Sequence, residues 1–80
     1  MDKLTSFEAV KKALRSAEIE FSEETINYET NLIDDGILDS LDAMSFLFEL
    51  ETIIGKRIKE IDDEFTDFKI NSFLEILKNY

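Results

Sequence analysis

The feature that most constrains this chain is the segment 40–54, which combines a helical apolar pattern with a signal at each end. Asp39 is a good N-cap, and Asp42 places a second carboxylate in the first turn, where the helix dipole favours it. Gly55 stands where a left-handed C-cap is needed, and two cations follow it. Apolar side chains cover well over half of the circumference: Leu41, Ala43, Met44, Phe46, Leu47, Phe48, Leu50, Ile53 and Ile54. We therefore predict a helix over 40–54 that either is central in a bundle or keeps one apolar face for a partner.

A first helix is predicted near the start of the chain. Thr5 to Glu8 match a capping box, in which the threonine caps the helix and the glutamate reaches back to its amide. Apolar residues then recur at helical spacing on one face, from Phe7 to Ala17. We expect this helix to cover residues 5–17.

The C-terminal third predicts one main helix and one short helix. Helical spacing of apolar residues favours a final helix over residues 71–79, for which either Ser72 or Asn71 is a suitable cap. A short helix is expected near residues 60–67, where apolar residues interrupt an acidic run. The chain contains no proline that would break either element.

Residues 18–39 form the longest segment without a regular period. A loop of this length is unusual in a small domain and tends to be functional or disordered. The segment carries too many large apolar residues for disorder, so we expect a loop that crosses the bundle with those side chains held down. Within it, residues 23–28 are expected to form a helical turn.

Length and composition predict one all-α domain over residues 1–80, a small helical bundle of three main helices and one short one. With no cysteine, the chain has neither a disulfide nor a cysteine metal site, and with no histidine it lacks the commonest general base and metal ligand. No apolar run approaches a membrane span, and the first residues lack the pattern of a secretory signal. We expect a cytoplasmic protein without a membrane partner.

The net charge of −10 is concentrated in one half of the chain. No Lys or Arg occurs between Arg15 and Lys56, whereas eleven acids do. Nucleic acid is therefore not expected as a partner, because binding it requires cations that neutralise phosphates. A basic protein surface is the natural complement, and such charge chiefly accelerates encounter and selects partners. The other interpretation is that the acids only keep a small domain soluble.

Ser40 occupies the first position of the predicted helix 40–54. A phosphate there would meet free backbone N–H groups and the positive end of the helix dipole. Asp39 and Asp42 disfavour a free anion but suit a basic enzyme that docks on this helix and modifies the serine. Catalysis by Ser40 itself has no support, because the chain has no His and no Lys close in sequence to activate it. The serine is thus either a modification site or ordinary helix-start chemistry.

Two further patterns have a structural and a functional interpretation. Met44 and Phe48 lie one turn apart on the face that runs down from Ser40, and such a stripe is either core or an exposed recognition patch. The second pattern is a group of acids that suggests a calcium loop but does not match EF-hand spacing, so no metal site is expected. Its members are Asp34, Asp35, Asp39 and Asp42.

The segment Leu32-Ile33-Asp34-Asp35-Gly36-Ile37-Leu38-Asp39-Ser40-Leu41-Asp42 resembles the attachment motif of acyl and peptidyl carrier proteins. The order of elements along almost the whole chain is also similar to that family. The resemblance implies that a phosphopantetheinyl transferase, using Mg²⁺, attaches 4'-phosphopantetheine from coenzyme A to Ser40. The arm then carries acyl or aminoacyl groups as thioesters, and the carrier, a monomer, is not an enzyme.

The resemblance also implies partners and a recognition surface. The partners are the transferase, an acyl- or aminoacyl-loading ligase, and downstream synthases and transferases with basic docking surfaces, in fatty-acid or in specialised lipid, polyketide or peptide biosynthesis. The second helix is the family's recognition helix, which implies partner contacts at six positions. These are Asp39, Leu41, Asp42, Met44, Phe48 and Glu51.

Departures from the family pattern favour a specialised carrier over a housekeeping fatty-acid carrier. Ser45, Thr52 and Ile53 stand where fatty-acid carriers usually have acids, and Lys59 stands where a proline is common. Phe68 and the apolar helix after it look more like peptidyl or D-alanyl carriers, so an aminoacyl carrier for cell-wall modification or nonribosomal synthesis is the main alternative. An alternative of another class is a small acidic interaction module that is never modified.

Overall fold

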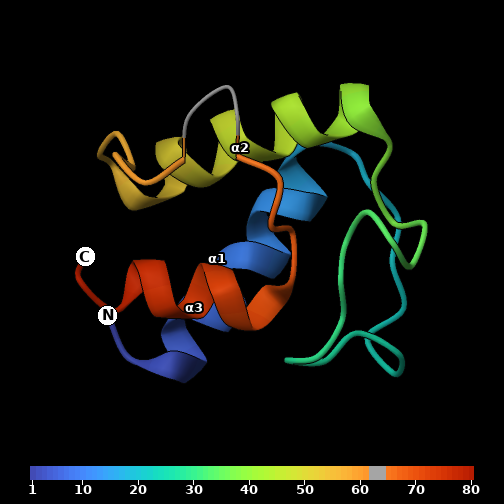
Figure 1. Cartoon of the computed structure of the whole chain (residues 1–80), viewed down its shortest axis with the longest axis horizontal. Coiled ribbons are helices and arrows are strands. Elements are labelled where there is room, and N and C mark those ends of the chain that lie inside the picture. The colour runs from blue at the N-terminus through green and yellow to red at the C-terminus, as the bar shows by residue number, and fades with distance from the viewer. Residues whose placement is uncertain (62–64) are drawn as a thin grey trace.

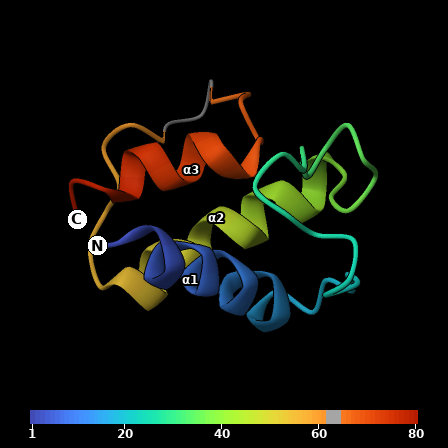
Figure 2. The same cartoon turned by 90° about the horizontal axis from the view of Figure 1, so that it is seen from below.

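The computed structural model describes residues 1–61 and 65–80, and in these it has three helices and no strand. They are α1 (Lys3–Ser16), α2 (Ser40–Ile54) and α3 (Ile70–Leu77). α1 packs against both α2 and α3, and the long loop between α1 and α2 lies at one end of the bundle (Figures 1 and 2). The all-α class expected from the sequence is confirmed.

α1 begins earlier than the capping box predicts. Asp2, not Thr5, is the N-cap: its carboxylate accepts a hydrogen bond from the Thr5 N–H at 2.7 Å, which lowers the pKa of Asp2. The expected start at residue 5 is wrong because an equally good cap stands three residues upstream, and the helix extends to it. α1 ends at Ser16, one residue before the expected end.

α2 has the bounds predicted from the sequence. Asp39 caps its start, and Gly55 closes its end in the left-handed conformation, with φ +80° and its N–H donating to the Glu51 carbonyl. Ala43, Phe46 and Leu50 are the buried residues of the helix. The rings of Phe46 and Phe73 meet edge to face with centroids 5.4 Å apart, which joins α2 to α3 within the core.

α3 covers Ile70–Leu77, so the expected range 71–79 is one residue late at its start and two too long at its end. Its N-cap is Lys69, which makes no side-chain cap bond; neither Asn71 nor Ser72 is the cap. The carboxylate of Asp67 instead accepts from the Lys69 N–H at 3.3 Å and from the Ser72 hydroxyl at 2.6 Å. The helix starts here because the preceding backbone is paired with the long loop.

The short helix expected near residues 60–67 is not seen in the described part of that stretch. Residues 62–64 lie outside the described residues, and the residues on either side of them are not helical. Beyond the gap the chain is extended, since the Phe68 carbonyl accepts the Leu32 N–H at 2.9 Å and Asn31 forms an isolated antiparallel bridge with Lys69.

The long loop is held down along its length, as its apolar content predicts. Ile19, Ile26, Leu32 and Leu38 are buried in the core. Its helical turn is shorter than expected: residues 23–25 form a single hydrogen-bonded turn.

Cations of α1 hold the outer side of this loop. Lys11 pairs with Glu8 at 2.9 Å and with Glu23 at 3.1 Å, and Arg15 also pairs with Glu23. The hydrogen bond that Lys11 donates to Glu8, followed by the one it donates to Glu23, raises the pKa of Lys11 against the effect of its burial. The loop is therefore a fixed part of the fold, and its last residues position the start of α2.

Candidate functional site

Ser40 is the first residue of α2 and is exposed. The Asp39 carboxylate beside it accepts from the Leu41 N–H at 3.0 Å and from the Asp42 N–H at 2.8 Å. The Ala43 N–H donates to the Asp39 carbonyl at 3.0 Å. The N–H groups of Leu41 and Asp42 are therefore not free, and for these two amides the expectation that a phosphate would meet free N–H groups is wrong. The start of α2 is a capped helix end that exposes one hydroxyl.

A closed turn precedes Ser40. The side-chain oxygen of Asn31 accepts from the N–H groups of Ile33 and Asp34, both at 3.0 Å, and the Asn31 N–H donates to the Asp35 carboxylate at 3.0 Å. Gly36 turns the chain with φ +79°, a conformation that strains other residues. The position of Ser40 is thus determined by a network of bonds and not by a free loop.

Two of the acids near Ser40 are engaged by the backbone. The carboxylates of Asp35 and Asp39 already accept backbone N–H groups. Among the described residues, no group of three or more acidic side chains is placed so that it could hold a metal ion.

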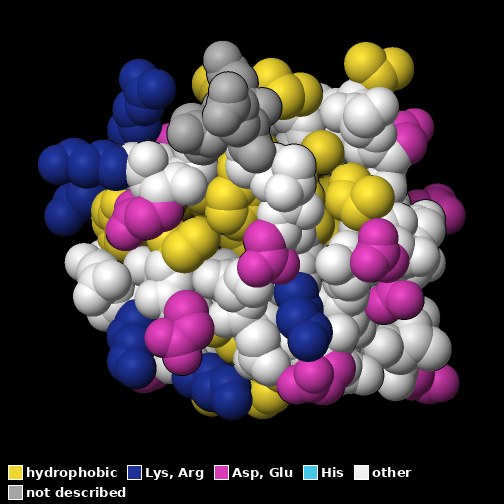
Figure 3. All heavy atoms as spheres, viewed as in Figure 1, with side chains coloured by type: hydrophobic (Ala, Val, Ile, Leu, Met, Phe, Trp, Pro, Cys, Tyr) yellow, Lys and Arg dark blue, Asp and Glu magenta, His cyan; other side chains and the backbone are white. Residues whose placement is uncertain are grey.

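An apolar ridge runs along the outer face of α2. Leu41 is 81% exposed, Met44 63% and Phe48 68%. Met44 and Phe48 were expected to be either core residues or an exposed recognition patch. Their exposure shows that they are not core residues and that they form a surface patch. In Figure 3 hydrophobic side chains emerge along the upper edge of the molecule, above α2. We refer to these three residues as the α2 ridge.

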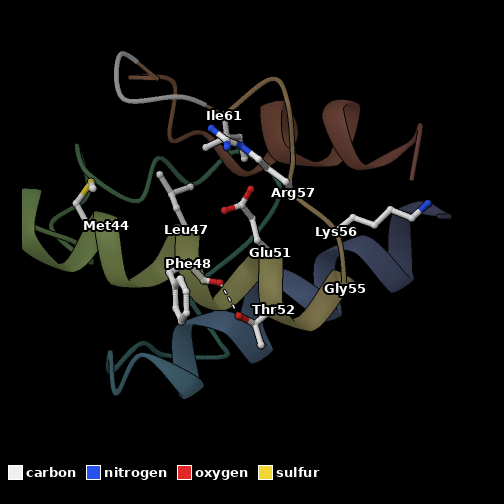
Figure 4. A pocket seen from close by; sticks show the side chains of 9 residues that line it. All are labelled: Met44, Leu47, Phe48, Glu51, Thr52, Gly55, Lys56, Arg57 and Ile61. Atoms are coloured by element: carbon white, nitrogen blue, oxygen red, sulfur yellow. Dashed lines mark hydrogen bonds between the residues drawn. The ribbon is translucent and has the colours of Figure 1, made fainter.

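Two open grooves flank the α2 ridge, and Met44 and Phe48 line both. The first groove, of about 650 Å³, lies between α2 and the chain that follows it. Its lining residues are Met44, Leu47, Phe48, Glu51, Thr52, Gly55, Lys56, Arg57 and Ile61 (Figure 4). Glu51 points from α2 toward the chain after Gly55, and its carboxylate accepts the Ile58 N–H at 2.7 Å. Glu51, which was expected to contact partners, therefore also has a structural role, since it binds the chain that follows α2.

The second groove, of about 450 Å³, lies between the C-terminal end of α1 and the outer face of α2. Its lining residues are Ser16, Ala17, Glu18, Met44, Ser45, Phe48 and Glu49. Glu18 is a residue that the sequence did not single out. The sequence offered one signal that could have found it. A helix often ends with a glycine in the left-handed conformation, and after α1 Glu18 stands in that place.

The acidic side chains around this site form no ion pairs with the Lys and Arg side chains that the structure describes. No ion pair between described residues involves Asp39, Asp42 or Glu49. Acidic side chains gather on the side of the long loop, while many Lys and Arg side chains lie on the opposite side (Figure 3). The face that carries Ser40 therefore suits a basic partner surface.

Fold and site together define a small all-helical domain that exposes a serine at a capped helix start, next to an acidic apolar surface. No protein-family model matches the chain, and neither a curated protein nor a solved structure shows significant similarity to it. Within the described residues, no helix combines the length and the apolar character that crossing a membrane requires.

Proposed function

We propose that this chain is an acyl or aminoacyl carrier protein and that Ser40 is the attachment point of a 4'-phosphopantetheine arm. The observation that carries the proposal is the exposed Ser40 hydroxyl at the first position of α2, between a closed turn and the capping carboxylate of Asp39. An enzyme can reach this hydroxyl without unfolding the domain. The motif around it resembles that of carrier proteins.

Attachment requires a nucleophile that another protein activates. The Ser40 oxygen forms a bond to the β-phosphorus of coenzyme A, the phosphoanhydride bond breaks, adenosine 3',5'-bisphosphate leaves, and the serine proton passes to a base of the transferase. The chain holds no histidine that would take this proton itself. We therefore assign it no catalysis of its own.

The chain has no cysteine and therefore no thiol of its own. The arm supplies a terminal thiol, which carries the cargo as a thioester. The chain's own residues present Ser40 and offer a docking surface. Asp39 and Asp42 suit basic groups of the transferase, the loading ligase and later enzymes, and the α2 ridge supplies apolar contact. The cargo is chosen by the loading enzyme, so fatty-acyl and D-alanyl or other aminoacyl cargoes are both compatible with this site.

The competing function is that of an acidic interaction module that is never modified. The exposed α2 ridge favours it, because large apolar patches mark protein interfaces whether or not a serine beside them is modified. The two functions differ in what happens at Ser40.

The test is incubation of the protein with coenzyme A, Mg²⁺ and a broad-specificity phosphopantetheinyl transferase, followed by intact-mass measurement. The mass is expected to rise by one phosphopantetheinyl group in the wild type and in Ser45→Ala, which removes another exposed serine of α2. Ser40→Ala is expected to stay unmodified. Addition at another residue would reject Ser40 as the attachment point. No addition with several transferases would reject the carrier function in favour of the interaction module.

A further inference from the structure

The second groove joins the α2 ridge to the end of α1, and Glu18 stands at that junction. α1 ends in a motif in which the Ile19 N–H donates to the Leu14 carbonyl at 2.9 Å and the Glu18 N–H to the Arg15 carbonyl at 3.0 Å. This motif needs a left-handed residue, and Glu18 supplies it with φ +61°. Glycine is the usual residue at such a position. Among the described residues, Glu18 is the only residue other than glycine that has a positive φ. The fold therefore carries a carboxylate at the groove where glycine would be less strained.

The groove has an apolar lining and a negative rim. Ala17, Met44 and Phe48 supply the apolar surface, and Glu18 and Glu49 supply the charge. No ion pair between described residues involves either glutamate.

The cation of α1 nearest to Glu18 in sequence is engaged elsewhere. Arg15 pairs with Glu23 and lies 5.3 Å from the centre of the Phe21 ring. A Lys or Arg surrounded by apolar side chains is therefore the chemistry that complements the groove.

The groove is also close to the modification site. Met44 lies four residues after Ser40 on α2, a rise of about 6 Å along the helix axis. α1 and α2 lie side by side in both views of the bundle (Figures 1 and 2). An enzyme that covers Ser40 and the α2 ridge thus extends naturally over the end of α1.

We propose that the second groove is a docking site for the phosphopantetheinyl transferase, and that it receives a basic, apolar segment of that enzyme, with Glu18 as its charged contact. This inference rests on the proposed function and extends the recognition surface beyond α2. Glu18 does not touch the reacting atoms, so its removal weakens docking and leaves the chemical step unchanged.

The test measures transferase kinetics on Glu18 variants at low salt. Glu18→Gln removes the charge and keeps the backbone strain, and we expect KM for the carrier to rise about two- to five-fold with kcat unchanged, as for an exposed ion pair. Raising the ionic strength should reduce the difference from the wild type. Glu24→Gln, at an exposed acid that does not line the groove, is the matched control and should behave as the wild type.

Glu18→Gly separates docking from stability, because its two effects have opposite signs. Glycine relieves the left-handed strain, so Tm should rise by a few degrees, whereas the lost carboxylate should raise KM as in Glu18→Gln. If Glu18 had only a structural role, a substitution that makes the fold more stable would not weaken binding to the transferase. Circular dichroism should show that both variants keep their helices.

The outcomes separate this inference from the proposed function. If the wild type is modified at Ser40 and both Glu18 variants keep its KM at low salt, the docking site is rejected and the attachment site stands. If the wild type is not modified by any transferase, the proposed function fails and the docking inference fails with it. A fall in kcat with unchanged KM would also overturn docking, because it would place the effect of Glu18 in the chemical step.

Discussion

The amide of Leu38 donates to the carbonyl of Leu32 at 2.8 Å, and both side chains are buried. This bond closes the turn that ends two residues before Ser40. Because the Leu32 N–H in turn donates to the Phe68 carbonyl, the turn is joined to the segment before α3. The serine is therefore presented by a junction of distant parts of the chain.

Asn31 is predicted to hold this turn closed. Asn31→Ala removes the acceptor of two backbone N–H groups and should lower the free energy of unfolding by about 1–2 kcal/mol. Hydrogen exchange at the Leu38 amide should accelerate more than exchange in the middle of α2. Asn31→Asp keeps an acceptor oxygen and should lose less stability. Equal loss in the two variants would show that the side-chain bonds do not hold the turn.

Asp39 is predicted to stabilise α2 through its cap. Asp39→Ala should cost about 1 kcal/mol, which corresponds to a fall in Tm of about 4–8 °C for a domain of this size. Asp39→Asn keeps the capping oxygen and removes the charge, so it should keep most of the stability. Thermal unfolding followed by circular dichroism measures both. If the asparagine variant is as unstable as the alanine variant, the charge matters more than the cap.

The bond between Tyr80 and Glu60 predicts a pH-dependent contribution to stability. The Tyr80 hydroxyl donates to Glu60 at 2.6 Å, which lowers the pKa of Glu60 and raises the pKa of Tyr80. A lowered carboxyl pKa stabilises the fold above the ordinary value of about 4.3, and this is lost as pH falls through the lowered pKa. A raised tyrosine pKa stabilises the fold below its ordinary value of about 10, and this is lost as pH rises through the raised pKa.

The measurement is chemical denaturation of the wild type and of Tyr80→Phe across pH. Their difference in unfolding free energy should be greatest between the two ordinary pKa values and should shrink toward both extremes. Tyr28→Phe is the control, because the described side-chain contacts of Tyr28 are made by its ring, with Phe7 and with Lys3, and its backbone bond is kept in the variant. A difference for Tyr80→Phe that does not change with pH would contradict the assigned bond.

Ser6 is fully buried in α1, and its hydroxyl has no hydrogen-bond partner among the described residues. Ser6→Ala should therefore raise the free energy of unfolding by about 1 kcal/mol or more, since it removes an unsatisfied polar group and improves helix propensity. Ser45→Ala, at an exposed position of α2, gains only the propensity and should stabilise less. Equal gains in the two variants would show that burying the hydroxyl costs nothing.

The sequence by itself determined the elements whose signals are local. The bounds of α2 were predicted correctly because Asp39, the apolar period and Gly55 act within the helix and its first neighbours. The start of α1 was placed incorrectly because two suitable caps stand in line, and only the folded chain shows that Asp2 is used. Ser40 could be selected from its place at a helix start, and the resemblance of its motif to that of carrier proteins implied its role as an attachment point, which stays a prediction.

Only the tertiary structure decided how this helix start is held and what surrounds it. The pairing of the long loop with residues 68–71 joins positions that are 36 to 43 residues apart, and no local pattern encodes which backbone groups meet. Apolar residues cover well over half of the circumference of α2, so burial of Phe46 and exposure of Phe48 depend on where α1 and α3 pack. Glu18 acquires its place beside the α2 ridge for the same reason, because a groove exists only once two helices meet.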